Sequence, residues 1–129
     1  MEIVNSLFQG DVYEASKKML DVAAMKHSAV ASNIANSSTP GYKRVDISKT
    51  FEQELQQSIK SRQGASIASL QPSIEQDSTA ISTRMDGNNV QLDQELLALS
   101  GNSTNYQALS QFVSGSLRQI RTAITGRSA

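Results

Sequence analysis

The side chains that most often carry out chemistry in enzymes are sparse in this sequence. Its single histidine, His27, lies in a stretch predicted to be helical, and the chain has no cysteine. Zinc sites need several His, Cys or acidic ligands at short spacings, and the His-Glu-x-x-His pattern of metalloproteases is absent. We therefore predict that His27 lies at a surface or an interface, and that it neither binds a metal nor transfers a proton.

Acidic, glycine and serine residues also lack the spacings of known catalytic or binding sites. Asp86, Asp93 and Glu95 flank a turn and a predicted helix start, where helix capping explains them, and they do not follow the calcium-loop pattern. The glycines form no phosphate-binding loop, and no serine stands in a Gly-x-Ser-x-Gly motif. We predict no catalytic, cofactor-binding or metal-binding residue, no small-molecule substrate and no enzymatic activity.

Composition limits the partners of the chain. Its 129 residues include 12 basic and 12 acidic ones, so the net charge is zero and no segment is strongly basic. This balance argues against nucleic acid or an anionic membrane as the main partner. No run of about 18 apolar residues predicts a membrane-spanning helix, and the N-terminus lacks a secretory signal pattern. We expect a cytoplasmic protein, or one that is exported without a cleaved signal peptide.

The chain is organised around a long predicted C-terminal helix, from Val90 to Ile124. Apolar residues recur along it in steps of four and three, interrupted only by Ser103 and Ser110. A repeat of about 3.5 residues keeps one stripe facing a neighbouring helix. We expect this stripe to pair with the N-terminal helix and to belong to an assembly interface. Its members are Leu92, Leu96, Leu99, Tyr106, Val113, Leu117, Ile120 and Ile124.

A second seam runs beside this stripe on the same helix. It contains Leu97, Gly101, Thr104, Ala108, Phe112 and Gly115, and its small residues would let another backbone approach closely. A glycine inside a helix costs about 0.8–1 kcal/mol relative to alanine, so close packing is a reasonable motive. The alternatives are a wide apolar face or a local kink. We predict that this seam, above all Gly101, Ala108, Phe112 and Gly115, packs against neighbouring subunits.

A long N-terminal helix is predicted from Val12 to Asn36. It follows a short lead that could form one apolar turn within residues 1–9, and Asp11 is its candidate N-cap. The helix has to end before Pro40, which disfavours a helical conformation at Thr39. Pro40 and Gly41 fit the two central positions of a type II turn, in which Gly41 takes a positive φ.

Turn signals also bound the C-terminal helix. The sequence Asp86-Gly87-Asn88-Asn89 predicts a turn, and Asn88 or Asn89 could cap the first helical turn. Gly126 is a suitable residue to end the helix.

The predicted fold class is mainly α, with long N- and C-terminal helices forming a coiled-coil-like pair. Residues 1–43 form the N-terminal helix and the Pro-Gly turn, and residues 86–129 form the C-terminal heptad helix. Between them, residues 44–85 form a polar segment with a short amphipathic helix near 50–60. The Ser- and Gln-rich remainder offers too little apolar surface to offset its ordering entropy, so we predict a flexible middle segment.

Two stretches resemble one family of bacterial structural proteins. The first carries Asn33, Ile34, Ala35, Asn36, Thr39, Pro40, Gly41 and Tyr42, and resembles the N-terminal signature of the flagellar rod, hook and hook-filament junction proteins, the axial family. The second begins with Asp86, Gly87, Asn88 and Asn89, and is similar to the C-terminal region of the B-type proximal rod branch. Residues 62–83 carry none of this resemblance.

The resemblance implies a structural subunit of the flagellar basal-body rod. Such proteins leave the cytoplasm through the flagellar type III export apparatus, without a cleaved signal peptide, and polymerise into the periplasmic rod, which transmits torque from the membrane ring to the hook. The implied partners are copies of the chain itself, other rod subunits, the rod-base adaptor and the membrane-ring protein. The alternative hypothesis is a cytoplasmic helical adaptor or export chaperone that binds a partner helix.

Overall fold

The computed structural model describes residues 10–82 and 84–126. The predicted apolar turn within residues 1–9 lies outside this range. The elements in chain order are α2 (Asp11–Ala35), β1 (Val45–Ile47), α3 (Lys49–Lys60), α4 (Gly64–Ser69), β2 (Ile74–Gln76) and α5 (Leu92–Thr125). The prediction of a mainly α fold with long N- and C-terminal helices that pack together is confirmed.

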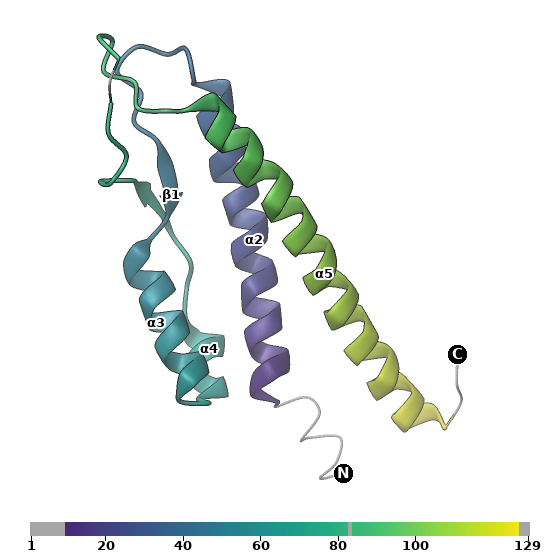
Figure 1. The fold of residues 1–129 in the computed structure, drawn as a ribbon. Coiled ribbons are helices and arrows are strands. Elements are labelled where there is room, and N and C mark those ends of the chain that lie inside the picture. The colour runs from purple at the N-terminus through teal and green to yellow at the C-terminus, as the bar shows by residue number, and fades with distance from the viewer. Residues whose placement is uncertain (1–9, 83, 127–129) are drawn as a thin grey trace.

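Helix α2 lies in the middle of the molecule (Figure 1). Helix α5 runs along one side of it in the antiparallel direction, and the middle segment covers the other side. Of all pairs of elements, α2 and α5 share the most extensive contact. The two helices lie close together near the end where α2 stops and α5 starts, and they diverge toward the opposite end (Figure 1).

The hydrophobic core forms between α2 and the middle segment. It consists of Ala15 on α2, Ile47 at the end of β1, Phe51 and Leu55 on α3, and Ile67 on α4. Phe51 and Leu55 are one helical turn apart, so both side chains point to the same face of α3. Among the described residues, no residue of α5 belongs to this cluster or to the side chains packed against it. This cluster is therefore complete without α5, although Ile120 on α5 is also buried.

The middle segment contains more regular structure than the sequence indicates. Helix α3 covers the stretch for which a short helix is predicted, but residues 61–76 also contribute α4 and β2. β1 and β2 pair in the antiparallel direction, with Val45 opposite Gln76 and Ile47 opposite Ile74. Strands of three residues are too short for alternating hydrophobicity to reveal them.

Contacts with α2 hold α4 in place. Ile67 is fully buried, and the Lys18 ammonium group donates a hydrogen bond to the Leu70 carbonyl at 2.8 Å. The Gly64 amide donates to the Asp11 carboxylate at 3.1 Å. Asp11 is thus the first residue of α2 and holds α4, whereas Gly10 occupies the N-cap position. The predicted capping role of Asp11 is wrong, because its carboxylate binds a distant amide instead of its own helix.

The Pro-Gly turn and the end of α5 match the sequence-based expectations. Gly41 has a φ of +73°, and the Tyr42 amide donates to the Thr39 carbonyl at 3.2 Å, which closes the predicted turn. Gly126 ends α5 with a φ of +64°. Both glycines occupy the left-handed region, which is costly for residues with a Cβ atom.

The less exposed face of α5 is shifted relative to the predicted stripe. Its buried and half-buried side chains centre on Glu95, Leu99, Asn102, Leu109, Val113, Ser116 and Ile120. The expected pairing of the whole stripe with the first helix is therefore wrong. The five stripe members that are exposed are Leu92, Leu96, Tyr106, Leu117 and Ile124. The physical reason is that Glu95 and Asn102 turn inward and form hydrogen bonds with α2 residues.

Candidate functional site

The two sequence motifs meet at the end of the molecule where α2 stops and α5 starts. The Gly41 amide donates to the Asp86 carbonyl at 2.7 Å, and the Lys43 ammonium group donates to the Gly87 carbonyl at 2.6 Å. Each contact joins the Pro-Gly turn to the Asp-Gly turn. We call the polar side chains that link the two motif regions the clasp. Its members are Asn33, Arg44, Asn88, Asn89 and Glu95.

Asn33 is the centre of the clasp on α2, and its side chain is completely buried. Its amide nitrogen donates to the Val45 carbonyl at 2.9 Å and to the Glu95 carboxylate at 3.1 Å. Its amide oxygen accepts from the Val45 amide at 2.9 Å and from the Tyr42 hydroxyl at 3.2 Å. One side chain therefore binds β1, the Pro-Gly turn and α5. A buried amide with all its groups satisfied fixes the relative positions of these elements.

Asn88 holds the end of α2 rather than the start of α5. Its side-chain nitrogen lies within hydrogen-bond distance of the carbonyls of Asn36, Ser37 and Thr39, at 2.9, 3.2 and 2.9 Å. These carbonyls follow the last turn of α2, where the backbone lacks helical partners. The prediction that Asn88 or Asn89 caps α5 is wrong: Gln91 stands at the N-cap position and makes no side-chain capping bond.

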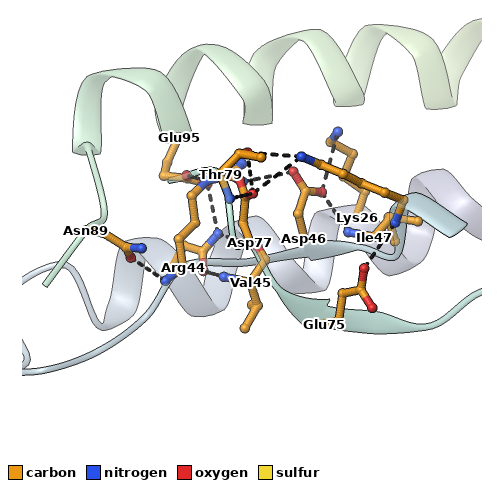
Figure 2. A network of polar contacts seen from close by, with 12 residues as sticks. Lys26, Arg44, Val45, Asp46, Ile47, Glu75, Asp77, Thr79, Asn89 and Glu95 are labelled. Atoms are coloured by element: carbon orange, nitrogen blue, oxygen red, sulfur yellow. Dashed lines mark hydrogen bonds and ion pairs between the residues drawn. The ribbon is translucent and has the colours of Figure 1, made fainter. Parts of the chain in front are cut away.

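Arg44 connects three segments through its guanidinium group (Figure 2). Its Nε atom donates to the Glu95 carboxylate on α5, and its Nη1 atom donates to Asp46 at 3.0 Å and to Asp77 at 2.8 Å. The Arg44 backbone amide donates to the Asn89 side chain at 2.6 Å. Glu95 is only 1% exposed, so this ion pair is well shielded from water.

The clasp contains residues that sequence reasoning did not single out. Arg44 directly follows the first motif, but its role depends on Asp46 and Asp77, which lie two and 33 residues away in the sequence. The only feature of the sequence that could have indicated the role of Arg44 is its position, as a positively charged residue directly after the first motif. Asn102 was missed as well: it is buried, and it donates to the Ala23 carbonyl at 2.8 Å in the middle of the α2–α5 contact.

Comparisons with known proteins place the chain in a family. The family described as "Flagella basal body rod protein" matches residues 23–43, which include Asn33 and the Pro-Gly turn. The flagellar basal body rod protein FlgB of Bacillus subtilis (strain 168) is 32% identical, over 94% of this chain and 98% of the relative. The chain belongs to the FlgB family of flagellar basal-body rod proteins. Two further relatives are less similar in sequence. FlgB of Borrelia hermsii is 26% identical, over 86% of this chain and 93% of the relative. FlgB of Buchnera aphidicola is 22% identical, over 89% of this chain and 95% of the relative.

The motif residues of this FlgB-family chain divide between the clasp and the surface. Asn33 and Asn88 are buried, and Asn89 is nearly so. Asn36 and Ile34 are half-buried, whereas Ala35, Thr39, Pro40, Gly41 and Asp86 are exposed. Tyr42 is half-buried and bonds to Asn33. The motif thus contains a structural part that positions the helices and an exposed part on the turn.

Most of the predicted assembly residues of the FlgB-family chain are exposed, but they lie on two sides of α5: the stripe lies beside the contact with α2 and the second seam lies opposite it. Large apolar side chains that are at least 40% exposed include Leu92, Leu96, Leu97, Tyr106, Phe112, Leu117 and Ile124. Gly101 and Ala108 are also exposed. The remaining members are at least partly covered: Leu99, Val113 and Gly115 are half-buried, and Ile120 is buried. The predicted interface therefore consists mainly of exposed residues, with a smaller number that other residues of the same chain cover.

The charges of the clasp shift the pKa values of two groups. Burial lowers the pKa of Arg44, but its hydrogen bonds to Glu95 and Asp46 outweigh burial, and the net pKa is above the ordinary value. Hydrogen bonds from Thr79, at 2.6 Å from the hydroxyl, hold the pKa of Asp77 below its ordinary value of 3.8, and the positive charge of Arg44 adds to this effect. Both groups are therefore stabilised in their charged forms.

The Asp77 shift predicts loss of stability in acid. Because the folded-state pKa is lower than the unfolded one, the contribution of Asp77 is complete above pH 3.8 and is lost as the pH falls through the folded-state value. We expect Asp77→Asn to be less stable than the parent chain at neutral pH, and to lose less stability between about pH 5 and about pH 2. Urea unfolding at several pH values measures this. Equal pH slopes for the two chains would contradict it.

Neither a metal-ligand group nor a membrane-spanning helix is found in the part of the chain that the structure describes. Within residues 10–82 and 84–126, no group of three or more His, Cys, Asp or Glu side chains is arranged to hold a metal ion. His27 is exposed on α2. Over the same residues, none of the helices combines the length and the apolar character needed to cross a membrane. The features that distinguish this FlgB-family chain are therefore the clasp and the exposed face of α5.

Proposed function

We propose that this chain is a structural subunit of the flagellar basal-body rod, and that it polymerises through its terminal helices. Its location would be the periplasmic rod of the basal body, which it would reach through the flagellar type III export apparatus without a cleaved signal peptide. In the rod, it would transmit torque from the membrane ring to the hook. Membership of the FlgB family supports this proposal, because the relatives are named as flagellar basal body rod proteins.

The exposed apolar face of α5 is the observation that carries the proposal. Leu97 is 74% exposed and Phe112 is 47% exposed, and neither belongs to the hydrophobic cluster between α2 and the middle segment. Exposed apolar side chains that follow one element over many turns are typical of a protein interaction site. A subunit that is incomplete alone and covered by its neighbours explains this surface.

The clasp supplies the rigidity that such a subunit needs. It fixes the start of α5 against the end of α2 through four buried side chains and the half-buried Arg44. Force applied to α5 is therefore passed to α2 and to the core by direct hydrogen bonds and ion pairs rather than through a flexible linker. The partners that we propose are copies of this chain, other rod subunits, the rod-base adaptor and the membrane-ring protein.

The location of the chain in the cell tests the proposal against the adaptor or chaperone hypothesis. Hook-basal bodies would be purified from detergent-extracted cell envelopes and probed for this chain, with a cytoplasmic protein as the contamination control. We expect the chain to co-purify with the basal bodies and to resist mild acid stripping together with the rod. A chain that stays in the cytoplasm and is absent from the basal bodies would refute the rod role and favour the adaptor hypothesis.

A further inference from the structure

We propose that the N-terminal segment, residues 1–9, packs against the inward side of α5 near the C-terminal end of that helix, and that it covers Ile120 there. The contact lies within one chain, at the opposite end of α5 from the clasp, and it does not depend on the proposed rod function. It assigns Ile120 to the packing of the single subunit, although the sequence pattern groups this residue with the assembly stripe.

The inward side of α5 stays covered as far as Ile120. Val113 and Ser116 are half-buried, and Ile120, which follows on the same side of the helix, is only 4% exposed. Of the buried residues of α5 it is the only apolar one. Leu117 and Ile124, each within about one turn of it, are 45% and 63% exposed. A specific contact therefore covers Ile120, whereas this end of the helix as a whole is open.

The described elements do not account for this burial. α2 and α5 are antiparallel, and the Asn102 side chain donates to the Ala23 carbonyl at 2.8 Å, which aligns these two positions. From there, Ile120 lies about 27 Å along α5, whereas α2 begins at Asp11, only about 18 Å away. Ile120 is therefore about 9 Å past the first residue of α2. In this direction the two helices diverge, and within the described residues α3 and α4 lie on the other side of α2 (Figure 1).

The N-terminal segment is the part of the chain that can supply the cover. The structure also leaves residues 83 and 127–129 undescribed, but residue 83 follows Ser82, whose hydroxyl donates to the Asn88 carbonyl at the clasp end. Residues 127–129 contain no large apolar side chain. The N-terminal segment, in contrast, contains Ile3, Val4, Leu7 and Phe8. Side chains at these three- and four-residue spacings lie on one side of a single helical turn.

The segment has the length and the starting direction that this contact requires. Gly10 has a non-helical backbone, with φ −61° and ψ 122°, so the preceding chain can leave the axis of α2 and follow α5. Nine residues span about 13 Å as a helix and up to about 30 Å when extended. The distance to be covered combines the 9 Å estimated above with the roughly 10 Å between neighbouring helix axes.

Charge on the two sides of the proposed contact is complementary. The only charged side chain of the segment is Glu2. Arg118 and Arg121 flank Ile120 on α5, and both are exposed. An apolar contact around Ile120 with one acidic and two basic side chains at its edge is the usual arrangement of a buried centre and a polar rim.

The accessibility of a thiol at position 120 tests the inference on the purified chain. The parent chain has no cysteine, so a single introduced thiol reports one position. We expect Ile120→Cys to react slowly with a maleimide, and the further changes Leu7→Ser and Phe8→Ser to raise its rate by about tenfold or more. Ile67→Cys, in the fully buried side chain position of α4, is the control for a general loss of folding and should stay slow with the same two serines.

A cross-link within the chain locates the cover without altering Ile120. Ser116→Cys would be combined with Leu7→Cys or, as a second position, with Phe8→Cys, and treated with a short bismaleimide at low protein concentration. Ser114→Cys is the matched control, because Ser114 is exposed on the opposite side of α5. We expect peptide mass spectrometry to find a link within one chain for at least one Ser116 pair, and far less of it for the Ser114 pairs.

The remaining outcomes overturn the inference in different ways. Fast reaction of Ile120→Cys in the otherwise unchanged chain would show that the position is not covered. A slow rate that the two serines leave unchanged would assign the cover to other residues. Links found only at twice the 13.9 kDa of the chain would place the contact between copies. If Ile67→Cys also becomes reactive, the cross-link decides, and its absence from both Ser116 pairs refutes the contact. All these results leave the rod function untouched.

Discussion

Glu95→Ala is expected to lower the free energy of unfolding by about 3 kcal/mol. The Glu95 carboxylate is buried and accepts hydrogen bonds from Asn33 on α2 and Arg44 beside β1, so its removal disconnects α5 from both. Breaking a buried ion pair typically costs about 3–5 kcal/mol. We expect the lower end of this range because Arg44 keeps Asp46 and Asp77 as partners. Urea unfolding followed by circular dichroism would measure the loss.

Asp93→Asn is the matched control for this change. Asp93 lies in the same first turn of α5 but is exposed, so its removal should change stability by less than about 1 kcal/mol. A loss for Glu95→Ala as small as that of the control would show that the clasp does not hold α5.

Arg44→Ala should lower the free energy of unfolding more than Glu95→Ala does, because it leaves the Glu95 carboxylate buried without a cation. The double variant should then cost less than the sum of the two single changes.

A pair of aspartates on the exposed face of α5, Leu97→Asp with Phe112→Asp, is expected to abolish incorporation into the rod and motility. Both side chains are exposed, so stability in the free chain should change by no more than about 1 kcal/mol in total. In the assembled rod, the two carboxylates would be buried without partners, and each would cost several kcal/mol. Motility in soft agar and the amount of chain in purified basal bodies measure the effect.

The control for the aspartate pair adds the same two charges elsewhere. Gln53→Asp with Gln57→Asp places them one turn apart on the exposed side of α3, away from the face that we propose to be covered. We expect these cells to swim. Normal motility of the Leu97 and Phe112 variant, with its folding confirmed by circular dichroism, would exclude this face of α5 from the assembly.

The sequence was sufficient to predict the long helices and their turns, because these depend on local rules. Pro40 and Gly41 predict their turn through the fixed φ of proline and the positive φ of glycine. Gly126 predicts the end of α5, because glycine readily takes the positive φ that commonly ends a helix. The short strands and α4 were not predictable, since they depend on contacts with α2, such as those of Lys18 and Asp11, that are remote in the sequence.

The face of α5 that turns inward could not be predicted from hydrophobicity. The pattern favours Leu96 and Leu117 as inward residues, whereas the structure buries Glu95 and Asn102. A buried polar side chain is stable only where its partners are already in position. Asn33 and the Ala23 carbonyl provide them, but both lie on another helix. The clasp was therefore visible in the sequence as two motifs, but not as a set of contacts.

The clasp holds α5 at one end, and α2 and α5 diverge away from it, which has a mechanical consequence (Figure 1). The clasp binds the first turn of a helix of 34 residues, which is about 50 Å long. Such a helix acts as a lever: a bend of about 10° just beyond the clasp moves its far end by about 8 Å. The hydrophobic cluster around Phe51 does not have to repack for this movement, since none of its members lies on α5, whereas the buried side chain of Ile120 has to move with the helix. In the rod that we propose, this movement would let subunits with one fold occupy sites that are not identical in geometry.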